Sequence, residues 1–211
     1  MGWWPPSGPW RACSLVRPRF LPAAGGVAGP AAFVAAWALL GGRAEDYDPT
    51  RDAISDLAAF GAPTRPVMTA GLLALGAGMA AYGVALRPRP SWPLPVLNGM
   101  TAVAVAALPL GGAYDDAHGV VAGLGYVTLA AVPVLGARRL RPAWAALSVA
   151  TGLVSGLCLL ASVLLPRDGL FQRLGLTVAH VWVVVSALGL LRSPTSSSTT
   201  PPAVAPAGRR R

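Results

Sequence analysis

Residues 43–65 read RAEDYDPTRDAISDLAAFGAPTR, and they separate two long apolar runs at about 22–42 and 66–86. Five of the eight acidic residues of the chain lie in this segment. The other three lie in two further short segments between apolar runs: Asp115, Asp116 and Asp168. The stretches at the opposite ends of these runs carry arginine and no acid. Such segregation assigns the acids to one water phase and most arginines to the other, so it predicts a membrane protein.

The composition excludes an ordinary soluble domain. Hydrophobic residues make up 54% of the 211 residues and charged residues only 12%, whereas a soluble domain has about 25% charged residues. All 17 basic residues are arginine, and the formal net charge is +9. Because the arginines flank apolar runs, we expect them to contact anionic lipid head groups, and we expect no nucleic-acid partner. The lack of lysine and the heavy use of Ala, Gly, Val and Pro indicate a GC-rich bacterial genome, and hence a bacterial plasma membrane.

Six windows are long and apolar enough to cross about 30 Å of hydrocarbon as helices of roughly 20 residues. They cover about residues 22–42, 66–86, 94–113, 118–137, 143–165 and 172–191. The predicted fold class is therefore an all-α membrane bundle of six transmembrane helices over residues 21–192, with Pro30, Pro109 and Pro133 tolerated inside the runs. We expect residues 1–20 to form a cytoplasmic segment and residues 193–211 a disordered cytoplasmic tail.

The arginines also predict the orientation of the bundle. With six spans, one side carries twelve arginines and no acid, and the other carries five arginines with all eight acids. The positive-inside rule then places both termini in the cytoplasm and the three acid-bearing loops outside.

Small residues recur at four-residue steps on three of the predicted spans, where they allow close helix–helix contact or line a polar cavity. They are Gly119 and Gly123 on the fourth span, Ser148, Gly152 and Gly156 on the fifth, and Ala70, Ala74 and Gly78 on the second.

The segment after Asp48 has the pattern of a short amphipathic helix. Asp48 followed by Pro49 is a helix-start signal, and Gly61 is a natural stop. At about 100° per residue the polar side chains share one face and the apolar ones the other: Arg51, Asp52, Ser55 and Asp56 against Ala53, Ile54, Leu57, Ala58 and Phe60. We therefore predict about three turns of helix that either lie on the outer surface or cap the bundle. Asp52 and Asp56 repel each other at this spacing, so either an arginine, a cation or a polar ligand pairs with them, or the face is simply solvated.

Two histidines join these side chains as candidate site residues. Asp115 and His118 lie three residues apart at the start of the fourth span, where aspartates also complement the helix dipole. His180 is the only ionisable residue well inside a span, which makes it either a functional group or a neutral histidine bonded to Ser or Thr. If the bundle gathers these groups, six side chains converge near its outer end: Asp52, Ser55, Asp56, Asp115, His118 and His180.

This set favours two kinds of chemistry. His118, His180 and Asp56 would suit Zn²⁺ with an open position for water. Alternatively, Ser55 would act as a nucleophile with His118 as its base and an aspartate nearby. No HExxH, GxSxG or CxxC spacing distinguishes the two.

The stretch YDPTRDAISDLAAFGAPTRPVMTAG at 47–71, the later DDAHG at 115–119 and the six-span plan resemble a bacterial membrane family known as domain of unknown function 998. The likeness covers roughly residues 25–192, and RDAISDL at 51–57 is its most specific part. It implies the six-span fold and the outer-loop motif, and it implies no established activity. A more distant likeness is to six- or seven-helix membrane hydrolases that use Ser, Asp and His near one face, although this chain lacks a third membrane histidine for a zinc mechanism.

These residues are compatible with two main classes of function. One is a membrane-embedded hydrolase or lipid-modifying enzyme with an outward-facing Asp/Ser/His site. The other is a non-catalytic membrane protein that binds lipid or a protein partner through the outer amphipathic helix. A transporter is disfavoured, because no charge other than His180 lies at membrane depth. An enzyme requires the histidines to lie near the outer Asp and Ser side chains, around a cavity.

Overall fold

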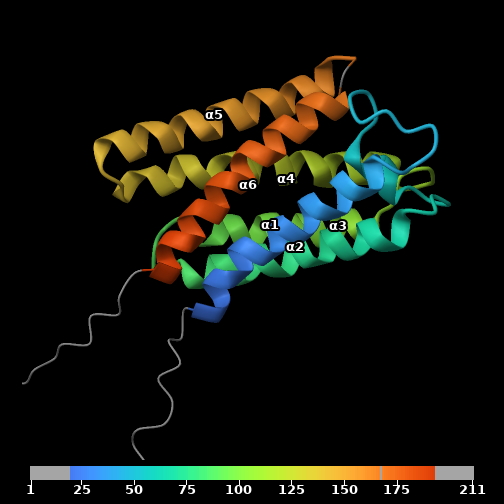
Figure 1. Ribbon diagram of the computed structural model, residues 1–211. Helices are drawn as coiled ribbons and strands as arrows, with labels where there is room; N and C mark the ends of the chain where they lie inside the picture. Colours follow the sequence, from blue (N-terminus) through green and yellow to red (C-terminus); the bar gives the residue numbers. More distant parts are fainter. Residues whose placement is uncertain (1–19, 167, 193–211) are drawn as a thin grey trace, which may run out of the picture.

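A computed structural model describes residues 20–166 and 168–192 (Figure 1). All regular secondary structure in these residues is helical. Six α-helices and two short 3₁₀ helices follow one another, and these described residues contain no strand. The elements are α1 (Phe20–Gly41), η2 (Ile54–Ala58), α2 (Arg65–Ala85), α3 (Pro93–Ala107), α4 (Asp115–Gly136), η3 (Ala137–Arg139), α5 (Pro142–Leu164) and α6 (Asp168–Arg192). The predicted all-α class is confirmed. The expectations for residues 1–19 and 193–211 lie outside the described residues.

The six α-helices form a ring in which each one packs against its neighbours in sequence, and α6 closes the ring against α1. Figure 1 shows the first residues of α1 and the last residues of α6 at one end of the bundle. The connection between α1 and α2, the α3–α4 connection and the start of α6 lie at the other. We call this second end the acidic end, because it carries residues 42–64, Asp115, Asp116 and Asp168.

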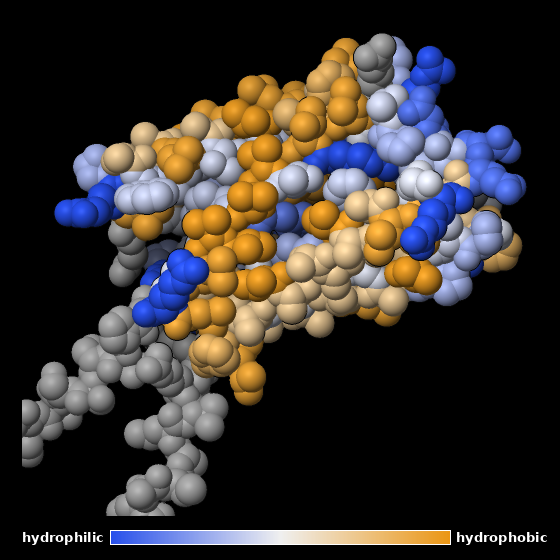
Figure 2. Space-filling view, in the orientation of Figure 1, coloured by the Kyte–Doolittle hydropathy of each residue, from blue (hydrophilic) through white to orange (hydrophobic). Residues whose placement is uncertain are grey.

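The helices have the length and surface of a membrane protein. Five of them (α1, α2, α4, α5 and α6) have 21 to 25 residues and are apolar enough to cross a bilayer, since a helix rises about 1.5 Å per residue. Large apolar side chains such as Val120, Leu157 and Val163 are exposed on the outside of the ring. Figure 2 shows apolar side chains over much of the middle of one face and hydrophilic ones mainly towards its ends. The chain is an integral, multi-pass membrane protein.

Helix α3 is shorter than the window predicted at 94–113. It has 15 residues, and its last residue is Ala107. Pro109 explains the early end, because proline disfavours helical geometry in the residue before it. Leu108 accordingly has φ −117° and ψ 73°. The expectation that Pro109 lies inside a helix is wrong, whereas Pro30 and Pro133 do lie inside α1 and α4.

Helix–helix contact through small residues is confirmed on α2 and α5. A Cβ added at Gly78 would lie 2.7 Å from the Cα of Gly29, and one added at Gly152 would lie 2.6 Å from the carbonyl oxygen of Ala130. The expectation is wrong for α4, because a Cβ at Gly119 or Gly123 would meet nothing within 4 Å in the described chain.

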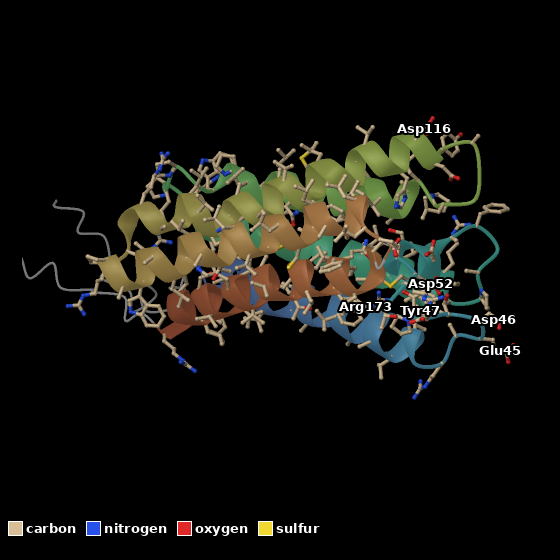
Figure 3. All side chains as sticks on the ribbon, turned by 90° about the horizontal axis from the view of Figure 1, so that it is seen from above. Glu45, Asp46, Tyr47, Asp52, Asp116 and Arg173 are labelled. Atoms are coloured by element: carbon tan, nitrogen blue, oxygen red, sulfur yellow. The ribbon has the colours of Figure 1, made fainter. Side chains whose placement is uncertain are left out.

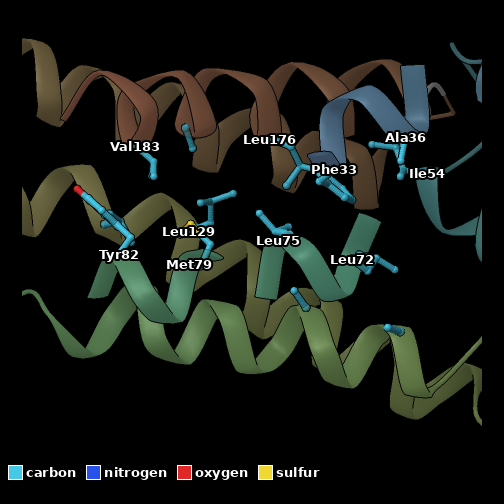
Figure 4. Packing of buried hydrophobic residues seen from close by; sticks show 14 of the residues in the cluster. Phe33, Ala36, Ile54, Leu72, Leu75, Met79, Tyr82, Leu129, Leu176 and Val183 are labelled. Atoms are coloured by element: carbon cyan, nitrogen blue, oxygen red, sulfur yellow. The ribbon is translucent and has the colours of Figure 1, made fainter. Parts of the chain in front are cut away.

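The predicted three-turn helix after Asp48 is also wrong. The segment is a series of turns that ends in the five-residue 3₁₀ helix η2. The Asp48 carboxylate accepts hydrogen bonds from the backbone N–H and the hydroxyl of Thr50, both at 2.8 Å. Such local bonds compete with helix formation. The apolar residues Ile54 and Leu57 are buried, so of the two expected placements the segment caps the bundle and does not lie on its outer surface; Figure 4 shows Ile54 next to Ala36 of α1. The predicted surface helix that would bind lipid or a partner is therefore absent from this segment.

Candidate functional site

A buried arginine fastens the η2 segment to α6. Arg173 Nη1 donates to the carbonyl oxygens of Asp52 at 3.0 Å and Gly169 at 2.9 Å, and Nη2 donates to the Tyr47 hydroxyl. Its guanidinium lies 5.5 Å from the ring centroids of both Trp37 and Tyr47. Figure 3 shows Tyr47, Asp52 and Arg173 together at the acidic end. Within the described residues this buried cation has no carboxylate partner, so its charge is satisfied by carbonyl oxygens and aromatic rings.

This attachment places Ser55 against His118. The Ser55 Oγ lies 3.1 Å from Nε2 of His118, and Nδ1 of His118 lies 2.6 Å from the carbonyl oxygen of Leu108. A carbonyl can only accept a hydrogen bond, so Nδ1 carries the proton. Nε2 of the neutral ring is then the acceptor for the Ser55 hydroxyl. The pair has the geometry of a nucleophile and its base, with a backbone carbonyl orienting the imidazole.

The end of α3 explains why the Leu108 carbonyl is available. In a continuing helix this oxygen would accept a bond from the N–H four residues later. Because the helix stops before Pro109, the oxygen instead accepts the Nδ1 proton of His118, which is buried on the first turn of α4. The proline that shortens α3 thus helps to position the His118 ring.

A second hydrogen-bond chain lies beside the pair. The backbone N–H of Ile54 donates to Gln172 Oε1 at 2.6 Å, and Gln172 Nε2 donates to the Tyr126 hydroxyl at 2.5 Å. The Ile54 N–H must donate, so it fixes which end of the amide faces which partner. Gln172, Tyr126 and Ser55 line the same cavity.

The aspartates expected at the site bind backbone N–H groups instead. Asp52 accepts from Asp48 N–H at 2.6 Å, and Asp56 from Ala53 N–H at 2.9 Å. Asp115 accepts from the N–H groups of Gly111 at 2.9 Å and Gly112 at 3.1 Å, so its carboxylate serves the α3–α4 connection and not His118. Asp52 and Asp56 thus have separate backbone partners, and among the described residues neither carboxylate lies within ion-pair distance of an arginine.

Two side chains of this segment have altered proton affinity. Partial burial raises the pKa of Asp56, and the nearby Asp52 and Asp168 carboxylates act in the same direction. The Ala53 hydrogen bond and His118 oppose this increase. Burial likewise raises the pKa of Tyr47, against the lowering effect of Arg173.

His180 lies deeper in the bundle than the other candidates. It is 2% exposed, and its ring packs edge-on against Phe33 with centroids 5.7 Å apart. Neither ring nitrogen has a hydrogen-bond partner in the described chain, so the predicted bond to Ser or Thr is not formed. The imidazole lines the far part of the cavity that Ser55 also lines.

The three residues expected to bind zinc do not form a metal site. Among the described residues, no group of three or more His, Cys, Asp or Glu side chains could hold a metal ion. The reason is geometric: His118 uses both ring nitrogens on Leu108 and Ser55, whereas His180 packs against Phe33. The geometry therefore gives no support to the zinc hypothesis.

Sequence reasoning missed three polar residues that line this cavity: Asn98, Tyr126 and Gln172. Their signal was present, because a polar side chain within or beside an apolar run is rare and calls for a partner. The amides of Asn98 and Gln172 are not ionisable, so they did not meet the criterion that singled out His180.

The fold and the site together define a multi-pass helical membrane protein with a serine–histidine pair near one end of its bundle. The chain belongs to the family described as protein of unknown function (DUF998), whose model matches residues 27–189, more than three quarters of its length. This match confirms the resemblance based on the motifs at 47–71 and 115–119. Comparisons with curated proteins and with solved structures give no match.

Proposed function

We propose that the protein is a membrane-embedded hydrolase that cleaves acyl esters, with Ser55 as nucleophile and His118 as general base. The observation that carries this proposal is the hydrogen bond of 3.1 Å between Ser55 Oγ and His118 Nε2, combined with the Leu108 carbonyl on Nδ1. Serine is a weak nucleophile by itself, and an adjacent base in the correct tautomer activates it. Ser55 is also partly exposed and lines a cavity, so a substrate has access to it.

The reaction needs no group beyond the pair and water. Ser55 Oγ attacks the ester carbonyl while His118 Nε2 takes the hydroxyl proton, and the tetrahedral intermediate collapses as the imidazolium returns that proton to the leaving alcohol. A water molecule then attacks the acyl-serine. His118 accepts a proton from this water and passes it to Ser55 Oγ as the acid leaves. The Leu108 carbonyl holds the ring and stabilises its charged form throughout.

Two neighbouring donors suit the negative charge that develops on the carbonyl oxygen. Tyr126 accepts a bond from Gln172, which leaves its own O–H free to donate, and Gln172 Nε2 has a second proton. Both side chains line the cavity with Ser55. Preorganised donors of this kind lower the barrier because they need no reorganisation during reaction.

The proposed site faces outward in a six-span bundle with both termini in the cytoplasm of a bacterium. In support, Glu45, Asp46, Asp52 and Asp116 gather at the acidic end (Figure 3). The positive-inside rule would put this end outside. Helix α3 would be the sixth span, although its 15 residues cover only about 22 Å. The arginines at the opposite end would contact anionic lipid head groups.

A serine-directed probe tests the catalytic role. The purified chain in lipid nanodiscs would be treated with a fluorophosphonate, and the labelled residue would be located by mass spectrometry. We expect labelling at Ser55, no labelling of Ser55→Ala, and a labelling rate about 10²-fold lower or less in His118→Gln. Ser162→Ala is the matched control, because that buried hydroxyl donates only to the Leu159 carbonyl of its own helix.

The same variants would be assayed for release of p-nitrophenol from acyl esters. Turnover that persists in Ser55→Ala, or folded wild-type protein that is neither labelled nor active, would refute the proposal. Persisting turnover would assign catalysis to another residue, and an inactive wild type would leave the Ser55–His118 bond as a tether between η2 and α4 in a non-catalytic membrane protein.

A further inference from the structure

Below the serine–histidine pair, a cavity of about 70 Å³ extends into the bundle between α1, α2, α3, α4 and α6. Most of its lining is apolar, including Phe33, Leu72 and Leu129. A space of this size is several times larger than the minimum needed for one water molecule. It is therefore large enough for part of a ligand.

The directions of the helices show how deep the cavity runs. Helix α6 starts at the acidic end and contributes Gln172 first and His180 last, so the lining extends over eight residue steps, or about 12 Å of helix rise. Helix α3 runs the other way, so Asn98 also lies at the far end. Ser55 lies at the near end, because its neighbour Ile54 is bonded to Gln172.

The far end holds polar atoms without partners. His180 is 2% exposed and Asn98 is 5% exposed, yet both ring nitrogens of His180 and the Oδ1 of Asn98 lack a hydrogen bond within the described chain. Asn98 Nδ2 donates to the Gly125 carbonyl at 2.9 Å, so Oδ1 is the free end of this amide. A buried polar atom without a partner destabilises the fold, and apolar surroundings offer no compensation.

These atoms define the chemistry of a matching ligand. A neutral imidazole has one N–H donor and one acceptor, and the amide oxygen is a second acceptor. A hydroxyl group matches this set, because it donates one proton and accepts another. An ionised group does not match it, since no Asp, Glu or Arg side chain lines the cavity.

We propose that this cavity binds an apolar chain that carries a hydroxyl group, with the hydroxyl at the far end between His180 and Asn98. When Ser55 acts on the other end of the same molecule, the substrate is an ester whose chain bears a hydroxyl about 12 Å from the cleaved carbonyl; this assignment of substrate rests on the proposed function. At about 1.25 Å per carbon of an extended chain, that distance corresponds to roughly ten carbons.

The test measures binding separately from turnover. Ser55→Ala protein in nanodiscs would be titrated with methyl esters of ω-hydroxy fatty acids of roughly six to fourteen carbons, and with the parent esters that lack the hydroxyl. Native mass spectrometry would give the affinities. We expect the hydroxylated ester to bind about 10-fold more tightly than its parent, with an optimum near ten carbons.

Variants of the far end would locate the effect. The hydroxyl preference should vanish in Asn98→Leu and His180→Phe, and it should survive at least in part in His180→Gln, which keeps a donor and an acceptor. Thr101→Val is the matched control, because Thr101 lines the same cavity but its hydroxyl already donates to the Asn98 main-chain carbonyl at 2.8 Å. This control should keep the full preference.

Equal affinity for the two esters, or no binding of either, would overturn the proposal and assign the polar atoms to trapped water. A hydroxyl preference without any Ser55-dependent turnover in the wild type would support the binding site and reject the proposed hydrolase. The two failures are therefore distinguishable.

Discussion

Replacing Gly169 with alanine should release the η2 segment that carries Ser55. A Cβ at this position would lie 2.3 Å from the Asp52 carbonyl oxygen and 2.8 Å from both the Pro49 carbonyl oxygen and Nη1 of Arg173. The nearest of these atoms belong to backbone, which cannot rotate away. Because ordinary contacts of a Cβ begin near 3.4 Å, the segment must move from α6 by about 1 Å.

The size of the effect follows from the bonds that such a movement breaks. Gly169 N–H donates to the Arg51 carbonyl at 3.4 Å, and Leu170 N–H donates to the Thr50 carbonyl at 3.1 Å. Each contributes about 0.5–1.5 kcal/mol, and the charged bond from Arg173 to the Asp52 carbonyl contributes about 1.5–3 kcal/mol. Alanine regains up to about 1 kcal/mol of helix propensity. The net loss of docking free energy is therefore roughly 2–5 kcal/mol.

Hydrogen exchange would measure this loss in lipid nanodiscs. A loss of 2 kcal/mol raises the population of the open segment about 30-fold, so amides in residues 48–58 should exchange at least about 30-fold faster. Peptides from α2 and α5 should be unchanged. Gly123→Ala is the matched control, since nothing lies within 4 Å of a Cβ there. Unchanged exchange at 48–58 in folded Gly169→Ala would show that the close approach to Asp52 does not hold the segment, and the reasoning would be wrong.

Three further substitutions test the packing and the charges of the same region. The raised pKa of Asp56 means that ionisation of its carboxyl disfavours the folded state. Asp56→Asn should therefore raise the melting temperature by about 1 °C at pH 7, and it should leave stability unchanged below pH 3.9, where the unfolded carboxyl is protonated. A pH series of thermal unfolding checks the sign. Arg173→Lys should accelerate exchange of the η2 segment, because an ammonium lacks the planar fork that serves Asp52, Gly169 and Tyr47 together. Gly99→Ala should lower the melting temperature by several degrees relative to Gly123→Ala, because its Cβ would lie 2.4 Å from the Gly76 carbonyl oxygen.

Charge and hydropathy predicted the architecture because they act over whole segments. An apolar run of about 20 residues must form a helix in lipid, where each backbone group needs an internal partner. The acids therefore had to gather where the helices turn, and Asp52 and Asp116 lie together at one end. The closeness of Ser55 and His118 was also predictable, because both residues lie in or next to predicted connections at that end. The arrangement of helices and connections therefore followed from the composition of whole segments.

Details that depend on single hydrogen bonds could not be predicted in the same way. The zinc hypothesis required His180 to lie at the same depth in the bundle as His118. Helix α6 starts at Asp168, and His180 lies about three turns beyond that start, deeper in the bundle. The three-residue spacing of Asp115 and His118 likewise did not predict the partners of Asp115, whose carboxylate accepts from the N–H groups of Gly111 and Gly112. A sequence pattern lists possible partners for a side chain, and only the fold decides between them.

The helix type predicted for the η2 segment was wrong, yet the segment still brings Ser55 into contact with His118. At about 100° per residue, Ser55 shares a polar face with Asp56; in a 3₁₀ helix of about three residues per turn, it is instead aligned with Ala58. Ala58 is buried, so Ser55 turns towards the bundle and His118, while Asp56 lies a third of a turn away and is exposed. The two neighbours therefore have different surroundings: Ser55 contacts His118, whereas the partly buried Asp56 carboxylate accepts from the Ala53 N–H. A carboxylate turned inward at the position of Ser55 would have to be desolvated at the mouth of the apolar cavity.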